Sequence, residues 1–219
     1  MIPCYQICKD HQCPHWDERM LDCSLLPDDC EHATAHLVSD RENQFLDGKE
    51  HGCWEVLASG KLFEDGLYVK GKKDGYWRIW NYRGQVLQEG AYVEDLRHGI
   101  WKSWYENGQS IGEILYVDGE MEGHCRTYHV NGKLFSEGVY EKGGREGEWR
   151  FWYDTGVLQK VERYRDGECN GLCTVFHENG RLFCEGNYVD GEQEGSCKFW
   201  TSSGEFNREE MYKNGMLVR

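Results

Sequence analysis

The sequence repeats itself every 24 residues, and this period constrains the fold more than any other feature. Two series of glycines and one series of tyrosines keep this step in register over about 160 residues, apart from a single interval of 23. Self-similarity at such a period is typical of stacked repeats that contact only their neighbours. The three series are Gly60, Gly84, Gly108, Gly132, Gly156, Gly180 and Gly204; Gly52, Gly75, Gly99, Gly123, Gly147, Gly171 and Gly195; and Tyr68, Tyr92, Tyr116, Tyr140, Tyr164, Tyr188 and Tyr212.

Each period predicts a strand, a turn, a second strand and a second turn. The segments 147–153 and 133–140 have the aromatic and aliphatic content of short strands. Asn107-Gly108 predicts a hairpin turn, because both residues tolerate positive φ, and Asp118-Gly119 predicts the turn that leads into the next copy. We therefore expect an all-β fold, an elongated single-layer antiparallel β-meander or solenoid of about seven two-strand repeats over residues 47–219.

Side-chain parity assigns the faces of the second strand. Counted from the turn glycine, positions +2, +6 and +8 fall on one face, as in Leu134, Gly138 and Tyr140. A small residue at +6 leaves room for a tryptophan from the adjacent strand. Ile114 and Glu162 replace the glycine in two copies, which predicts local irregularity there. The residues expected to build the repeat include Trp77, Trp101, Trp149, Tyr92, Tyr116, Tyr140, Tyr188, Gly84, Gly108, Gly132 and Gly180.

The tryptophan position holds cysteine in three copies, and position +5 of the second strand is acidic in six of seven. We interpret the cysteines as small buried residues that replace a ring, with redox or metal roles as the alternative. We expect the acidic series to pair with Arg or Lys or to bond neighbouring turns, with a functional acidic stripe as the alternative. The cysteines are Cys125, Cys173 and Cys197, and the first copy has Trp54 at this position. The acidic residues are Asp65, Glu89, Glu113, Glu137, Glu185 and Glu209, with Val161 in the seventh copy.

These residues resemble the MORN-type repeats, in the second variant found in bacterial antitoxin-like and large-DNA-virus repeat proteins. The segment 179–195 follows its pattern of Asn-Gly, Leu, Glu-Gly, Tyr and two further glycines, and the resemblance covers about residues 47 to 219. It implies a narrow, curved, single-layer antiparallel sheet that acts as a scaffold or dimerisation element. A membrane role is often attached to the broader family name, and the charge of this chain disfavours it.

Residues 1–46 do not follow the period and form a separate Cys/His-rich segment. The expected role is a cap on the first repeat, with a candidate short helix between Leu25 and Val38. The alternative is a structural zinc module that the repeats display, because thiolates and imidazoles are zinc ligands. Its candidate ligands are Cys4, Cys8, Cys30 and His32, although their spacing departs from paired zinc knuckles.

Charge and cysteine content restrict the partners and the compartment. The chain has 39 acidic and 25 basic residues, a formal net charge of −14, which disfavours nucleic acid and anionic membranes. No apolar run reaches the ~20 residues of a membrane-spanning helix. The first residues, starting Met1-Ile2-Pro3-Cys4, lack the features of a signal peptide, and 11 cysteines cannot all pair. We expect a cytoplasmic, reducing location with mostly free thiols.

No constellation of catalytic residues stands out, so the chain is expected not to be an enzyme and to need no cofactor. The histidines His51, His98, His124, His129 and His177 read as lone surface residues without a common register. The leading hypothesis is a non-catalytic protein–protein interaction scaffold that presents an extended aromatic-lined β surface. Self-association is a second mode, since Met216-Leu217-Val218 at the far end suggests a homodimer. Lipid binding is a third.

Overall fold

A computed structural model of the chain describes residues 44–58 and 60–218, and these residues contain strands and turns but no helix. There is accordingly no helix in the described part that is long and apolar enough to cross a membrane. The strands are β1 (Gln44–Leu46), β2 (Lys49–Ala58), β3 (Lys61–Val69), β4 (Lys72–Trp80), β5 (Val86–Val93), β6 (Leu96–Trp104), β7 (Ser110–Val117), β8 (Glu120–Tyr128), β9 (Leu134–Glu141), β10 (Gly144–Trp152), β11 (Leu158–Arg165), β12 (Glu168–Cys169), β13 (Gly171–Phe176), β14 (Leu182–Val189), β15 (Glu192–Trp200), β16 (Phe206–Lys213) and β17 (Met216–Val218).

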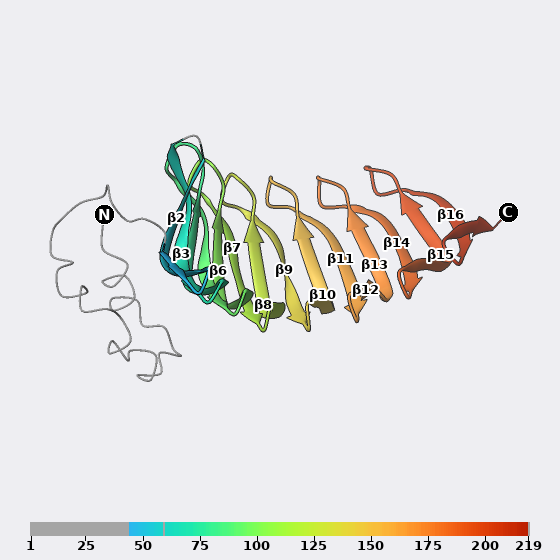
Figure 1. Cartoon of the computed structure of the whole chain (residues 1–219). Helices are drawn as coiled ribbons and strands as arrows, with labels where there is room; N and C mark the ends of the chain where they lie inside the picture. The colour runs from blue at the N-terminus through green and yellow to red at the C-terminus, as the bar shows by residue number, and fades with distance from the viewer. Residues whose placement is uncertain (1–43, 59, 219) are drawn as a thin grey trace. The chain divides into compact units, whose positions relative to one another are not determined.

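The strands form one open antiparallel sheet in which each pairs with its neighbours in the sequence (Figure 1). The short β12 pairs only with β11, and β11 continues to β13. This arrangement confirms the predicted all-β, single-layer meander. The first strand, β1, starts at Gln44 and pairs with β2, so the sheet includes three residues ahead of the expected boundary at residue 47.

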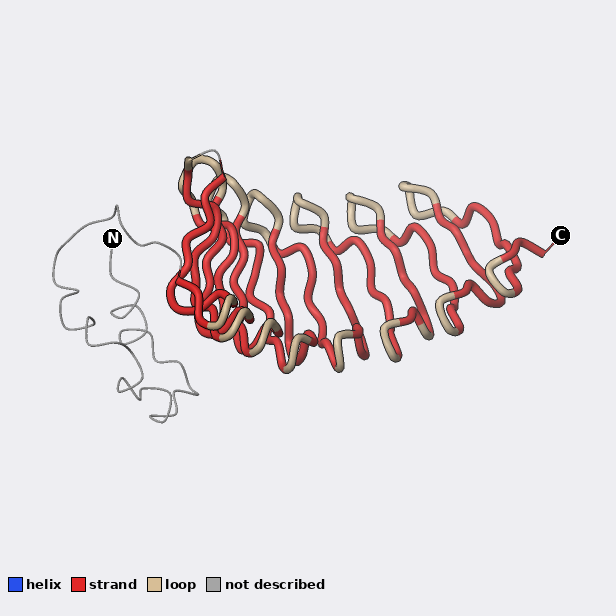
Figure 2. Tube along the Cα trace, viewed as in Figure 1, coloured by secondary structure: helices blue, strands red, loops and turns tan. Residues whose placement is uncertain are grey.

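The two long edges of the sheet carry different turns, which Figure 2 shows as two rows of loops. On one edge, Asp118 and Gly119 both have positive φ, 50° and 86°, as a two-residue type I′ hairpin requires. On the other edge, Gly108 has φ 83° but Asn107 is not left-handed. The predicted hairpin therefore forms with positive φ at the glycine and not at the asparagine.

Asn107 contributes to its turn through its side chain instead. Its Oδ1 accepts a hydrogen bond from the amide of Gln109 at 3.1 Å, and its Nδ2 donates to the carbonyl of Val130 in the next repeat at 3.2 Å. Asn131 and Asn179 make the same pair of bonds one and three repeats further along. The asparagines thus join successive turns into a row.

Each long strand bends where a repeat opens. Glu146 of β10 pairs with Val139 of β9, and Arg150 pairs with Glu137, so three residues of β10 face Gly138 alone. Gly147 lies inside this bulge with φ 67°, a conformation that favours glycine. The bend recurs at the opening glycine of the other long strands and gives the sheet a corner along its length.

A second irregularity lies beside the other turn and changes one face assignment. Thr127 pairs with Ser136, but Tyr128 pairs with Leu134, which leaves Phe135 as an extra residue. Leu134 therefore shares a face with Tyr128 and not with Gly138, because the bulge inverts the alternation. The prediction for position +2 is wrong, whereas Gly138 and Tyr140 do share a face.

Candidate interaction surface

One face of the sheet, here called the aromatic face, carries the tryptophan series and buries it. Trp77, Trp101 and Trp149 are 0%, 2% and 1% exposed, and each packs on the glycine of the preceding strand. A Cβ added to Gly138 would lie 2.2 Å from Cδ2 of Trp149, so only glycine leaves room for the ring. This is the packing that the sequence predicts for position +6.

The rings continue from repeat to repeat as edge-to-face contacts. Tyr68 lies 5.0 Å from Trp77 by ring centroids, Trp77 lies 6.1 Å from Tyr92, and Tyr92 lies 4.9 Å from Trp101. Such arrangements are the favoured geometry of aromatic pairs. The tyrosine series therefore alternates with the tryptophans to form the interior of a sheet that has no second layer in its described part.

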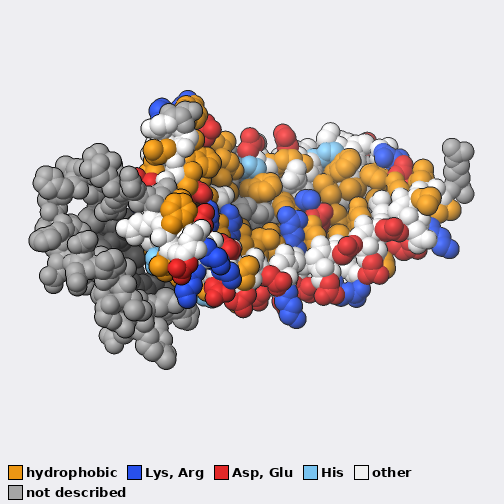
Figure 3. Space-filling model, viewed as in Figure 1, with side chains coloured by type: hydrophobic (Ala, Val, Ile, Leu, Met, Phe, Trp, Pro, Cys, Tyr) orange, Lys and Arg blue, Asp and Glu red, His pale blue; other side chains and the backbone are white. Residues whose placement is uncertain are grey.

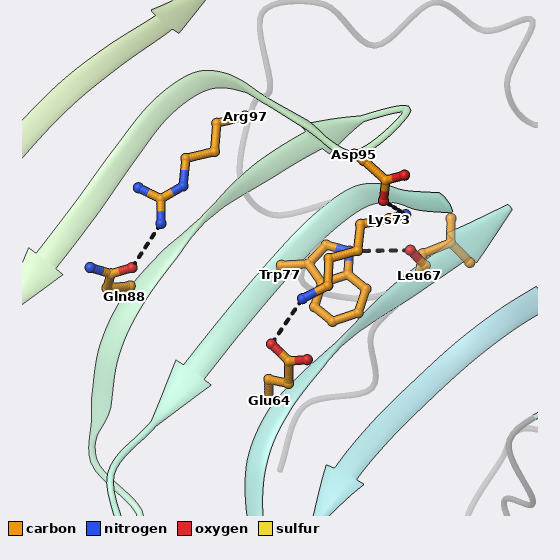
Figure 4. Close-up of polar contacts among 7 residues, drawn as sticks. All are labelled: Glu64, Leu67, Lys73, Trp77, Gln88, Asp95 and Arg97. Atoms are coloured by element: carbon orange, nitrogen blue, oxygen red, sulfur yellow. Dashed lines mark hydrogen bonds and ion pairs between the residues drawn. The ribbon is translucent and has the colours of Figure 1, made fainter. Parts of the chain in front are cut away.

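A cation covers each buried tryptophan, as Figure 4 shows for Trp77. Nζ of Lys73 lies 4.0 Å from the ring centroid and 2.9 Å from Oε2 of Glu64, while the indole Nε1 donates to the carbonyl of Leu67 at 3.1 Å. Arg97 and Arg145 repeat the stacking at 4.2 and 4.7 Å. These cations were not predicted from the sequence, although each stands four residues before its tryptophan.

The copies without tryptophan change as sets. Cys125 packs against Ile114 instead of glycine, and Met121 stands where the cation would be. Likewise, Cys173 lies beside Glu162, with Cys169 at the cation position. The expected irregularity occurs beside Glu162, where the strand that pairs with β11 is interrupted at Asn170 between β12 and β13. At Ile114, in contrast, β7 is a full-length strand. A bulky residue opposite a small one fills the volume that a ring occupies elsewhere.

Burial also determines the protonation of these thiols. Cys125, Cys173 and Cys197 are all buried. Burial, followed by the charge of Glu162, raises the pKa of Cys173 to about 12, and burial raises the pKa of Cys125 as well. They are neutral thiols at physiological pH. This supports the interpretation that they replace a ring, since the reactive form of cysteine is the thiolate.

The opposite face, here called the charged face, carries the acidic series, and it pairs with basic residues. Arg78 contacts Asp65 at 2.8 Å, and Arg126 contacts Glu137 at 3.2 Å. Burial raises the pKa of the Asp65 carboxyl, and the hydrogen bond and charge of Arg78 oppose that shift. The expected pairing with Arg or Lys is confirmed at these positions. Lys102 with Glu113 at 3.7 Å and Arg150 with Glu137 at 3.5 Å continue the row.

The charged face is hollowed over β7 to β10. A cavity of about 870 Å³ is lined there by carboxylates and guanidinium groups together with an aromatic ring. The side chain of Arg126 is 68% exposed, so it extends into solvent beside the hollow. Both charge signs and an aromatic wall are suited to recognising polypeptide. Residues that line the hollow include Glu113, Tyr128, Glu137, Glu148, Arg126 and Arg150.

Side chains at the turns form a further row that sequence reasoning missed. The ring nitrogen Nε2 of His129 lies 2.8 Å from the carbonyl of Trp152, and that of His177 lies 3.1 Å from the carbonyl of Trp200. The two histidines are 48 residues apart, so they do share a register, and the expectation of lone surface residues is wrong for them. Tyr105 and Tyr153 donate equivalent bonds at the intervening positions.

No group of three or more His, Cys, Asp or Glu within residues 44–58 and 60–218 is arranged to hold a metal ion. The zinc candidates Cys4, Cys8, Cys30 and His32 lie outside the described residues, as does the candidate helix.

Comparison with known proteins points to one family. The sequence model of the family described as MORN repeat variant matches four consecutive segments of this chain, 97–118, 121–142, 145–166 and 170–190, which span β6 to β14. A crystal structure of a protein of unknown function from Bacteroides fragilis NCTC 9343 aligns over 77% of this chain and 96% of that chain, at 11% identity and a TM-score of 0.13. A score this low does not show a common fold. No curated protein matches the chain.

Proposed function

Because the chain is a MORN-type repeat protein, we propose that it is a non-catalytic scaffold that binds polypeptide on its charged face. Repeats of this family often mediate protein or membrane interactions and are generally not catalytic. The observation that carries the proposal is the 870 Å³ hollow over β7 to β10, where charges of both signs and Tyr128 line an open sheet surface. Extended repeat surfaces of this kind commonly serve as binding faces.

The two faces of the sheet divide structure from recognition. On the aromatic face the rings are covered by each other and by Lys73, Arg97 and Arg145, so they offer little surface to a partner. On the charged face, the side chains of Arg126 and Arg150 are 68% and 49% exposed. Charged groups arranged in this way give specificity and steer encounter more than they add affinity. A partner would therefore be recognised by its charge pattern.

The thiols support a reducing compartment for this function. Cys125, Cys169, Cys173, Cys184 and Cys197 carry free thiols. Free thiols in this number are typical of intracellular proteins. Self-association through the charged face is a special case of the proposal, in which the partner is a second copy of the chain.

Site-specific photo-crosslinking tests the proposal. A photoreactive phenylalanine analogue replaces Tyr128 in the hollow or, as the control, Trp200 at the same register three repeats further on. We expect a crosslinked product in cells from position 128 only, and we expect Arg126→Glu to reduce it while Lys198→Glu does not. A product at twice the 25.7 kDa chain mass would identify self-association.

The result that contradicts the proposal is equally definite. If position 128 gives no more product than position 200, and native mass spectrometry shows a monomer under the same conditions, the charged face is not a binding surface. Equal loss of product on Arg126→Glu and Lys198→Glu would show nonspecific charge attraction instead.

A further inference from the structure

An exposed apolar patch lies on the charged face beside the hollow. Its members come from β5, β6 and β7 and are between 38% and 55% exposed. Cross-strand pairing places Val93 next to Leu96 and Ile100 next to Leu115, so the side chains are direct neighbours. We call this set the β5–β7 patch: Val93, Leu96, Ile100, Leu115 and Val117.

The patch is continuous across two repeats. The side chain of Leu96 reaches the next turn, where its Cδ2 would lie 3.2 Å from a Cβ on Gly119. Val117 pairs with Glu120 of β8, and Leu115 pairs with Glu122. A contiguous apolar surface with a polar rim is typical of an interaction site, whereas isolated apolar residues are normal on any surface.

The rim of the patch is acidic. The turn between β5 and β6 contributes Glu94 and Asp95, and the turn between β7 and β8 is flanked by Asp118 and Glu120. Glu94 pairs with Lys72 at 3.1 Å, but both side chains are largely exposed. Within the part of the chain that the structure describes, Asp118 and Glu120 form no ion pair. Figure 3 shows acidic side chains, with basic ones among them, along the lower edge of the sheet in this view.

Charge decides which occupant fits. A second copy meeting its own patch would bring two acidic rims together, and the net charge of −14 adds to that repulsion. Anionic lipid and nucleic acid are repelled by the same rim. A polypeptide that places apolar side chains on the patch and Lys or Arg at the rim satisfies both features.

We propose that the β5–β7 patch binds a basic amphipathic polypeptide segment. The apolar side chains of this segment would contact Ile100 and Leu115, and its basic side chains would lie against Asp118 and Glu120. This inference deepens the proposed function and rests on it, since the patch and the hollow belong to the same face. It assigns to the partner a composition: apolar residues interleaved with Lys or Arg.

The repeat supplies matched controls. Asp166 and Glu168 occupy the register of Asp118 and Glu120, 48 residues further on, and Leu172 occupies the register of Ile100. The substitutions suit the backbone, because Lys70 and Lys142 hold the Asp118 position with φ of 53° and 49°, and Ser196 holds the Ile100 position. Far-ultraviolet circular dichroism verifies folding of each variant.

The probe is a fluorescent 18-residue peptide of Leu and Lys in an amphipathic pattern, titrated with the full chain and followed by anisotropy. We expect Ile100→Ser, and separately Asp118→Lys with Glu120→Lys, to weaken binding by about tenfold. Leu172→Ser, and Asp166→Lys with Glu168→Lys, should change binding less than about twofold. A peptide with Glu in place of Lys should not bind.

Three outcomes overturn the inference. Equal weakening by the patch variants and their controls would show nonspecific attraction to an acidic protein. A dimer in sedimentation that Ile100→Ser abolishes and Leu172→Ser retains would make the patch a self-interface, and binding of anionic vesicles that Ile100→Ser abolishes would make it a lipid site. Peptide binding lost with Arg126→Glu but not with the patch variants would refute the patch and leave the proposed function standing.

Discussion

Replacing the glycine–tryptophan pair of one repeat by the isoleucine–cysteine pair of the next tests whether the larger residue compensates for the lost ring. Gly90→Ile alone places a side chain where even a Cβ would lie 2.4 Å from Cδ2 of Trp101, and such overpacking costs about 3 kcal/mol. Trp101→Cys alone removes a ring that is 2% exposed and donates to the carbonyl of Ala91 at 2.8 Å, which costs about 4 kcal/mol. Together the two substitutions recreate the pair Ile114 and Cys125.

We expect the double variant to be more stable than the sum of the single effects. A coupling of about 2 kcal/mol is within the range seen for contacting residues. Urea unfolding with an m-value of about 2 kcal/mol/M would show it as a midpoint about 1 M higher than additivity predicts. Arg97→Met completes the set, because Met121 stands at the equivalent position in the copy with Cys125.

The control combines Gly90→Ile with Trp149→Cys, two substitutions in different repeats. Their effects should add to within about 0.5 kcal/mol. If Gly90→Ile and Trp101→Cys are also additive, with unchanged m-values, the compensation argument fails, and the coincidence of Ile114 with Cys125 has no packing cause.

The remaining predictions concern charge and protonation on the aromatic face. Arg145→Met removes the cation above a buried ring and should lower the free energy of unfolding by about 1 kcal/mol, measured in urea. Burial and the hydrogen bond to Glu162 raise the pKa of Tyr164 to about 12. The stability that the protonated Tyr164 contributes is therefore complete below pH 10 and lost between pH 10 and 12. Glu162→Gln should lower the pKa of Tyr164, measured by ultraviolet titration. Iodoacetamide at pH 8 should leave Cys173 unmodified until urea unfolds the chain, because burial and the charge of Glu162 raise the pKa of this thiol to about 12.

The period alone was sufficient to predict the meander, because a strand-turn-strand unit has few ways to stack. The glycine that accommodates Trp149 was also predictable, since a missing side chain beside a large one implies contact. Both inferences depend on neighbours within one or two strands. Features that depend on the backbone path were not predictable in the same way: the bulge at Phe135 inverts the alternation, and parity counting has no means of detecting it.

The same limit applies to the candidate surface. The hollow over β7 to β10 is lined by residues of four strands, from Glu113 of β7 to Arg150 of β10, and spacing along the sequence does not indicate where a sheet surface is hollowed. The cation row was accessible, by contrast, because Lys73, Arg97 and Arg145 each precede a tryptophan by four residues and are absent where cysteine replaces it. Its meaning required the observed stacking, since residues four apart in a strand were expected only to share a face.

The two faces differ in how they tolerate change, and this difference indicates where specificity resides. On the aromatic face, two of the three departures from tryptophan come with a partner residue that restores the volume. On the charged face, the position after the opening glycine is aliphatic, aromatic, charged or small in different repeats, and only at Glu148 does the residue paired with it, Arg163, form an ion pair with it. The residues at this position are Tyr76, Ile100, His124, Glu148, Leu172 and Ser196. Substitution there leaves the packing of the rings intact, so each repeat can present a different side chain to a partner. The sheet thus keeps the packing of its aromatic face while its charged face varies from repeat to repeat, and this variation suits the proposed recognition of one extended polypeptide.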